Sequence, residues 1–102
     1  MIEIFDLAKQ KLATIKDDNN VVDEHGSRLG RVEPDGEVYD TFNKKVGFVD
    51  SKGYVFNDKL SHIGTVKENG NVLDYNLHTV GQVRGKFVEL GGAVFLLLFK
   101  KD

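Results

Sequence analysis

Five acidic or amide side chains recur at a spacing of seventeen residues and are the first candidates for chemistry in this chain. These residues are Asp6, Asp23, Asp40, Asn57 and Asp74. If the repeat is arranged about an axis, their oxygens form a ring that could bind Ca²⁺, which takes about six to eight oxygen ligands. A calcium ring is therefore one interpretation of this pattern.

The alternative is that each of these side chains closes a turn. Asp and Asn accept hydrogen bonds from backbone N–H groups two residues further on, and this contact stabilises tight loops. Gly26 and Asn43 stand three residues after their aspartates and tolerate the left-handed conformation that such a loop needs. Leu60 and Leu77 occupy that position in the next two copies and fit it less well. We expect the turn.

The remaining polar side chains do not gather into a catalytic pattern. The histidines stand at three different positions of the repeat: His25, His62 and His78. The serines lie in expected loops without a nucleophile elbow: Ser27, Ser51 and Ser61. The chain has no cysteine, which excludes thiolate catalysis, disulfides and cysteine-ligated metals. We expect no enzyme, no cofactor, and no catalytic or metal-binding residue.

A seventeen-residue repeat supplies the elements that position these side chains. It spans units 3–19, 20–36, 37–53, 54–70 and 71–85, which are followed by residues 86–102 of the same single domain. Each unit reads as two short strands rich in β-branched residues and bounded by Gly, Asn and Asp. The internal glycines are Gly30, Gly47, Gly64 and Gly81, and the valines two residues later are Val32, Val49, Val66 and Val83. In the first unit Ala13 replaces the internal glycine, and Asn19 stands in the final turn, where we expect positive φ.

Short turns join antiparallel neighbours, so the units predict an all-β meander of ten or eleven strands. Unpaired strand edges invite aggregation, and closure of the last hairpin onto the first removes them. We therefore expect a closed, shallow barrel with pseudo-five-fold symmetry. The internal glycines then mark a close approach of backbones near the axis.

The C-terminal residues depart from the repeat. Residues 86–90 look like one more first strand, which Gly91 and Gly92 then break so that the chain can turn inward. The apolar run Ala93 to Phe99 has no alternation and must be buried on all sides. It forms either a closing strand or a helical plug along the barrel axis. We expect the plug.

The repeated pattern consists of Val, an apolar residue, Asp or Asn, five loop residues, an apolar residue, Gly, any residue and Val. In this pattern the chain resembles the five-fold β-flower proteins. These are small, mostly bacterial proteins whose β-hairpin petals form a shallow symmetrical barrel. The resemblance covers residues 3 to about 90 and implies a fold, with almost nothing about activity. In shape the family is more distantly similar to Tubby-like barrels, which hold a central apolar helix and act at membranes.

Composition narrows the function classes further. The net charge of −2 gives no basic field, so nucleic acid is not an expected partner. The start of the sequence does not resemble a secretory signal, and we expect a cytoplasmic protein. The most direct interpretation is a non-catalytic structural or binding module. Its partner is an unknown protein or a second copy, and Phe42 and Phe48 are surface interaction candidates because their repeat equivalents are polar.

Two alternatives remain open. One is a peripheral membrane protein that binds lipid, by likeness to the Tubby-like barrels. The other is an open β-solenoid that polymerises, since solenoid coils have similar lengths. The hairpin turns argue against the solenoid.

Overall fold

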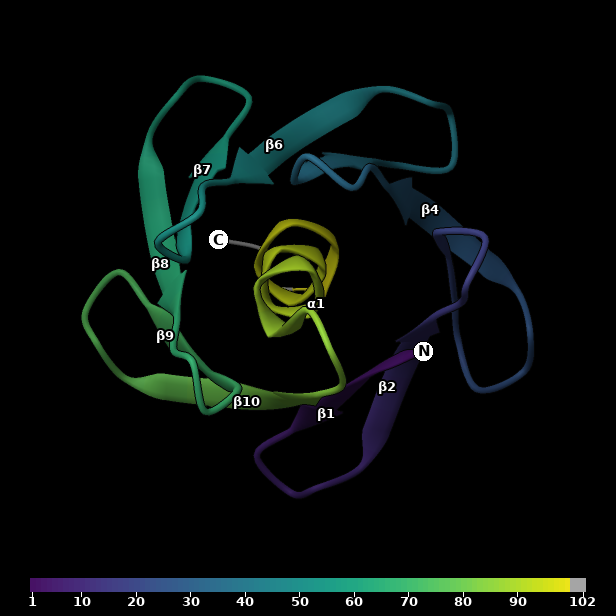
Figure 1. Ribbon diagram of the computed structural model, residues 1–102, viewed down its shortest axis with the longest axis horizontal. Coiled ribbons are helices and arrows are strands. Elements are labelled where there is room, and N and C mark those ends of the chain that lie inside the picture. Colours follow the sequence, from purple (N-terminus) through teal and green to yellow (C-terminus); the bar gives the residue numbers. More distant parts are fainter. Residues whose placement is uncertain (100–102) are drawn as a thin grey trace.

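The chain folds into a closed ten-stranded antiparallel barrel around a central helix, in a computed structural model that describes residues 1–99 (Figure 1). Consecutive strands pair into five hairpins, which we call petals 1 to 5. Petals 1 and 2 are β1 (Ile2–Asp6) with β2 (Lys11–Ile15) and β3 (Asn20–Val22) with β4 (Arg28–Val32). Petals 3 to 5 are β5 (Glu37–Tyr39) with β6 (Lys45–Val49), β7 (Tyr54–Asn57) with β8 (His62–Val66), and β9 (Asn71–Asp74) with β10 (Thr79–Arg84).

The barrel closes where β1 pairs with β10, in a register that sets Glu3 opposite Arg84 and Ile4 opposite Val83. Every strand therefore has two neighbours in the sheet. The all-β closed barrel predicted from the repeat is confirmed, and the open solenoid is wrong. The first and last petals have matching edges because all five units share one strand pattern.

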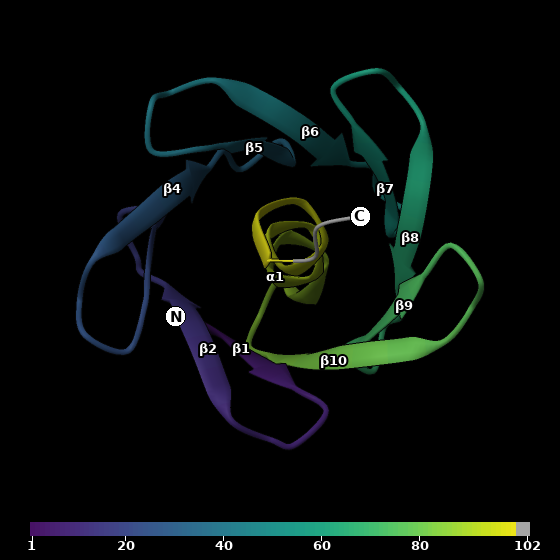
Figure 2. The ribbon, with the colours of Figure 1, turned by 180° about the vertical axis from the view of Figure 1, so that it is seen from behind.

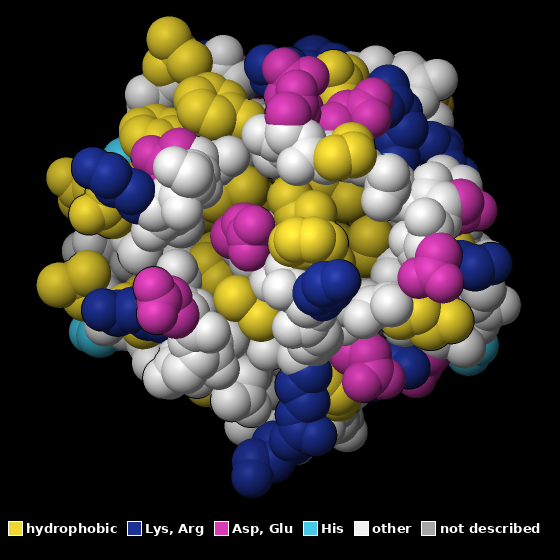
Figure 3. Space-filling model, viewed as in Figure 1, with side chains coloured by type: hydrophobic (Ala, Val, Ile, Leu, Met, Phe, Trp, Pro, Cys, Tyr) yellow, Lys and Arg dark blue, Asp and Glu magenta, His cyan; other side chains and the backbone are white. Residues whose placement is uncertain are grey.

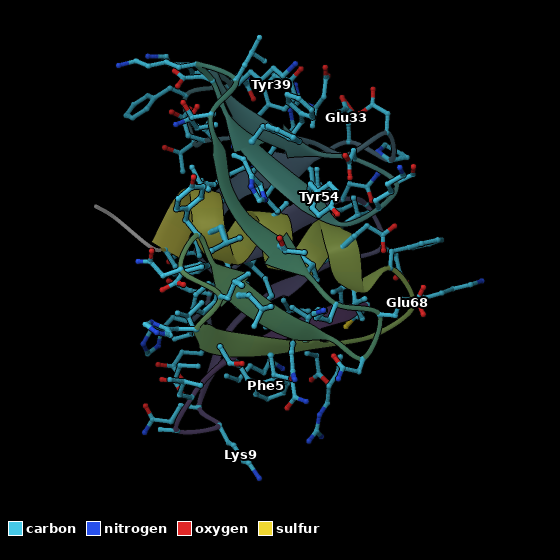
Figure 4. All side chains as sticks on the ribbon, turned by 90° about the vertical axis from the view of Figure 1, so that its left-hand side faces the viewer. Phe5, Lys9, Glu33, Tyr39, Tyr54 and Glu68 are labelled. Atoms are coloured by element: carbon cyan, nitrogen blue, oxygen red, sulfur yellow. The ribbon has the colours of Figure 1, made fainter. Side chains whose placement is uncertain are left out.

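Two kinds of connection alternate around the ring. Tip loops join the two strands of a petal and stand out radially, whereas inner turns join one petal to the next (Figure 1). Glu33 and Glu68 belong to two inner turns and lie at the end of the barrel where the central helix begins (Figure 4). Asn19 adopts a φ of 71° in the first inner turn, as predicted. Its carbonyl accepts a hydrogen bond from Val32 N at 3.0 Å, which ties petal 1 to petal 2.

The core consists of aliphatic side chains that the repeat places on the inner face of every strand. In petals 2 to 5 a fully buried Val lies opposite the internal glycine, as Val38 lies opposite Gly47, and in petal 1 Ile4 lies opposite Ala13. The buried Val and Ile residues that recur at the seventeen-residue spacing are Ile4, Val21, Val38, Val55 and Val72 in the first strands and Ile15, Val32, Val49, Val66 and Val83 in the second strands. β-branched side chains pack well on such a pleated surface, which explains their use at these positions.

The C-terminal segment fills the barrel axis. It comprises the α-helix α1 (Val88–Val94) and the π-helical turn η1 (Phe95–Phe99), which faces the viewer in Figure 2. Ala93, Val94 and Leu96 are buried. The predicted plug is confirmed for residues 93–99, whereas residues 100–102 lie outside the described part of the chain.

The additional strand predicted for residues 86–90 is wrong. β1 already occupies the free edge of β10, so that segment has no strand to pair with, and the helix begins at Val88 instead. Gly91 and Gly92 do not break the chain but lie inside α1. A Cβ atom at Gly91 would come within 2.9 Å of Ile2 Cγ2, and one at Gly92 would collide with Val66. The two glycines thus let the helix lie close to the barrel wall.

The π-helical turn contacts the internal glycines in sequence. Built Cβ atoms on Gly81 and Gly64 would come within 2.8 Å of Phe95 Cε2 and 2.6 Å of Leu96 Cδ1. On Gly47 and Gly30 they would come within 2.7 Å of Leu97 Cδ2 and 3.2 Å of Leu98 Cδ1. Consecutive residues of η1 therefore face petals 5, 4, 3 and 2. Each of these Cβ atoms would also collide with a backbone carbonyl of the neighbouring petal, so the close approach of backbones expected for these glycines is confirmed.

Candidate functional site

The repeated Asp and Asn side chains close the tip loops. In petal 3, Asp40 Oδ1 accepts hydrogen bonds from Phe42 N at 2.8 Å and Lys44 N at 3.0 Å. Asn57 makes the same two contacts with Lys59 N and Ser61 N. The predicted turn is confirmed, and each carboxylate or amide is held against its own loop. In residues 1–99 no group of three or more His, Cys, Asp or Glu side chains is placed to hold a metal ion.

In every tip loop the residue three positions after the repeated Asp or Asn adopts a positive φ, whatever its type. The residues are Lys9, Gly26, Asn43, Leu60 and Leu77, with φ between 61° and 85°. Leucine rarely adopts this conformation because its Cβ crowds the following carbonyl oxygen. Leu60 and Leu77 are also 72% and 71% exposed. Two leucines in petals 4 and 5 are therefore held in an unfavourable backbone conformation while facing solvent.

On the outside of petals 1 to 3, equivalent positions hold polar pairs. Lys11 Nζ lies 3.1 Å from Glu3 Oε2, and Lys45 Nζ lies 2.8 Å from Glu37 Oε2. The Lys45 ammonium and, more weakly, the Tyr39 hydroxyl lower the pKa of Glu37 through hydrogen bonds. The same contacts with Glu37 raise the pKa of both Lys45 and Tyr39. In petal 2 the position is held by Arg28, which donates to Asn20 Oδ1.

Petal 4 replaces this pair with two rings. Tyr54 and His62 occupy the positions of Glu37 and Lys45, and their ring centroids are 5.4 Å apart in an edge-to-face arrangement. Tyr54 lies on the outside of β7, on the side of the barrel turned toward the viewer in Figure 4. The His62 Nε2 atom is 3.3 Å from Thr65 Oγ1. Petal 4 thus carries two aromatic rings at the positions where petal 3 carries a salt bridge.

The rings continue on both sides of petal 4. Phe56 lies 5.6 Å from His62 and stacks on Phe48 of β6 at 5.1 Å, and Tyr75 of the fifth tip loop lies 5.9 Å from His62. We call the resulting surface the aromatic face: Phe48, Tyr54, Phe56, His62 and Tyr75. In the space-filling view, hydrophobic side chains gather along the left-hand margin over petals 4 and 5 (Figure 3).

The two predicted surface residues lie at different depths. Phe42 projects from the third tip loop and is 88% exposed. Phe48 is half-buried in the stack with Phe56, and Lys45 Nζ lies 5.4 Å from its ring centroid. The structure brings Phe48 into the aromatic face and leaves Phe42 at a neighbouring tip. Neither placement tests binding, so both stay predictions.

His25 and His78 are exposed in tip loops, and only His62 of the three joins a cluster of side chains in residues 1–99. The serines also remain separate, with Ser27 and Ser61 in tip loops and Ser51 in an inner turn.

Small depressions surround the start of α1. One of 210 Å³ is lined by Ile2, Ile15, Phe87 and neighbouring polar residues, and two others measure 180 and 150 Å³. Ligand pockets are commonly about 300–1,000 Å³, so these hollows are small for a dedicated site. A larger open hollow of 450 Å³ lies between petals 1 and 2 and is lined by side chains of both charges, including Lys11 and Glu24. The aromatic face is the stronger candidate.

Residues 2–100 match the sequence profile of the family described as 5-fold beta-flower protein. The chain belongs to the five-fold β-flower family. Searches of curated proteins and of solved structures returned no match. The five hairpin petals around a central axis agree with this membership.

Within this β-flower protein, sequence reasoning missed Tyr54, His62 and Tyr75 as surface residues. The sequence gives no reason to group His62 with His25 and His78, because the three histidines stand at different positions of the repeat. The sequence does hold one signal for this surface. Lys11, Arg28 and Lys45 place a cation at this position of petals 1 to 3, and His62 replaces that cation in petal 4. No helix described in residues 1–99 is long and apolar enough to cross a membrane.

Proposed function

We propose that this β-flower protein is a non-catalytic binding module whose binding surface is the aromatic face. The observation that carries the proposal is the replacement of the Glu37–Lys45 pair by Tyr54 and His62 at the same repeat positions. A rigid closed barrel holds these rings at fixed separations, and exposed tyrosine supplies contact area at little loss of side-chain freedom. The predicted cytoplasmic location stays a prediction.

The variant that tests this proposal is suggested by the chain itself. Tyr54→Glu combined with His62→Lys reproduces in petal 4 the pair that petal 3 already carries, so the fold should be retained. Tagged wild-type protein and the double variant are compared as baits in extracts of the cell that produces the protein. We expect species captured by the wild type, copies of the same chain included, to be lost with the variant. Identical capture by both baits contradicts the proposal.

A lipid surface is the second candidate partner. Phe42 is followed by the exposed Lys44, and Leu60 is preceded by the exposed Lys59, so two neighbouring tips combine an apolar side chain with a cation. Such tips suit the interface of an anionic membrane, where apolar contact and charge attraction add. Flotation with vesicles containing phosphatidylserine tests this candidate. Binding that salt releases and that Phe42→Ser weakens supports it, and failure to float refutes it.

A further inference from the structure

We propose that the aromatic face is occupied by the same face of a second copy of this chain, so that the protein forms a two-fold symmetric dimer. This inference rests on the proposed function, because it names the partner of the same surface. Three features of the molecule support it: the closure of the sheet, the concentration of exposed apolar residues on petals 3 to 5, and the mixture of charges around them.

Closure of the barrel determines how copies can meet. Each strand is paired on both sides, so within residues 1–99 no strand edge is free to accept a strand from another chain. Association must then use outward-facing side chains. The outer surface of petal 3 offers the Glu37–Lys45 pair, which is already satisfied within the chain. The rings of the aromatic face can bury more area on contact with a partner.

Most of the exposed apolar side chains of the petals lie on one part of the ring, with Leu7 on petal 1 as the exception. Tyr54, Tyr75 and the tip residues Leu60 and Leu77 all belong to petals 4 and 5, with Phe42 on the adjacent petal. Petal 2 instead carries Glu24 and His25 at its tip. A surface on one side of a ring favours a closed pair, whereas equivalent surfaces on all petals would favour larger assemblies.

Charges near the face favour a like partner. Lys59 stands next to Asp58 beside Leu60, and Asp40 and Lys44 flank Phe42. Each of these tips therefore offers both signs, and a two-fold rotation can bring a cation of one copy to an anion of the other. Because the aspartates offset the lysines, these tips suit a like partner better than an anionic membrane or nucleic acid, both of which attract an excess of cations.

The backbone of two tips adds a further indication. Leu60 and Leu77 keep positive φ values of 66° and 69°, where Gly26 and Asn43 of petals 2 and 3 are better suited. Strained residues often mark positions whose side chain serves binding. In the dimer both leucines lie at the margin of the contact and lose their exposure to water.

Sedimentation velocity of the purified protein tests the proposal over a range of about 1 to 500 µM, which covers the affinities of weak homodimers. We expect a monomer–dimer equilibrium in the wild type. Tyr54→Glu/His62→Lys should shift the dissociation constant by at least about tenfold toward monomer. Leu60→Asn/Leu77→Asn should weaken association while keeping or raising the unfolding midpoint, a combination that misfolding would not produce. Leu7→Asn, an exposed leucine on petal 1, is the matched control and should leave the equilibrium unchanged.

Three results would overturn the dimer. The wild type could remain monomeric throughout the range, the face variants could associate like the wild type, or the protein could stay monomeric in solution and float with phosphatidylserine vesicles. If the purified protein is monomeric but the face variant still loses captured species from extracts, the binding module stands and only the second copy is excluded.

Discussion

Leu96 of the central plug lies against Gly64 of petal 4, and a Cβ atom built on that glycine would come within 2.6 Å of Leu96 Cδ1. The same Cβ would also collide with the backbone carbonyl of Leu73. A flexible side chain can yield to a methyl group, but a carbonyl within the sheet cannot do so without moving a strand. The glycine is therefore required by both the barrel wall and the plug.

Gly64→Ala should destabilise the protein by about 2–3 kcal/mol, because the added methyl group overpacks a closed core. Urea denaturation followed by circular dichroism measures this change. Gly26→Ala is the matched control, since its Cβ would meet no atom within 4 Å and only the φ of 85° opposes it. The control should lose about 1 kcal/mol. Equal effects at the two glycines would contradict the packing argument.

Leu60→Asn should stabilise the isolated chain by about 0.5–1 kcal/mol, because asparagine tolerates a positive φ better than leucine does. The urea midpoint of dilute protein measures the gain. Leu7→Asn replaces a leucine of similar exposure that is not among the residues with positive φ. It should change stability by less than about 0.5 kcal/mol. A loss of stability in Leu60→Asn would show that the leucine makes stabilising contacts within its own loop.

Asp40→Ala should destabilise the protein by about 1 kcal/mol, because Phe42 N and Lys44 N both lose their acceptor. Asp40→Asn should be nearly neutral, since Asn57 already makes the equivalent pair of contacts in petal 4. Thermal unfolding of both variants, with and without Ca²⁺, measures the difference. A calcium-dependent stabilisation of the wild type that Asp40→Asn removes would instead support the calcium ring.

Glu37 should make the stability of the barrel sensitive to acid. Its pKa is lowered from 4.5, so the stabilisation by its carboxylate is complete above that value and is lost as the pH falls through the lower folded pKa. The pKa of Lys45 is raised from 10.5, so its contribution is complete below that value and is lost as the pH rises through the raised pKa. The pair is intact at neutral pH.

Glu37→Gln should therefore flatten the fall in unfolding free energy between about pH 5 and pH 2. Urea titrations at several pH values measure this slope. Glu68→Gln, at an exposed glutamate of an inner turn, is the matched control and should retain the wild-type slope. The same slope in wild type and Glu37→Gln would mean that the Glu37–Lys45 contact does not stabilise the fold.

The repeat was sufficient to predict the barrel because each position of the unit meets the same surroundings in every petal. Val38 and Val55 are buried because both lie on inward-facing strand positions. The strand predicted for residues 86–90 was wrong because the repeat was extended by one more unit. The sequence pattern does not reveal that β1 already pairs with β10 and leaves no free edge for another strand. Likewise, Gly91 and Gly92 are compatible with a break in a strand and also with a helix that packs closely against the barrel wall, and the sequence does not distinguish the two.

The aromatic face was harder to predict because it depends on contacts between petals. Phe48 and Phe56 are eight residues apart in the sequence and stack because β6 and β7 pair in one register. Tyr75 reaches His62 from a different tip loop. The positive φ of Leu60 and Leu77 was also not predicted with certainty from residue type, because leucine alone avoids this conformation. The loop hydrogen bonds accepted by Asn57 and Asp74 hold the backbone in it.

The sequential contacts between η1 and the internal glycines bear on how such a chain can evolve. Because one unit of seventeen residues makes one petal, the insertion or deletion of a unit would add or remove one petal. The plug restricts these events, because successive residues from Phe95 to Leu98 each face a successive petal. A sixth petal would have no plug residue to face it unless the C-terminal segment were lengthened in the same lineage. We therefore expect the number of units and the length of the plug to change together in related chains.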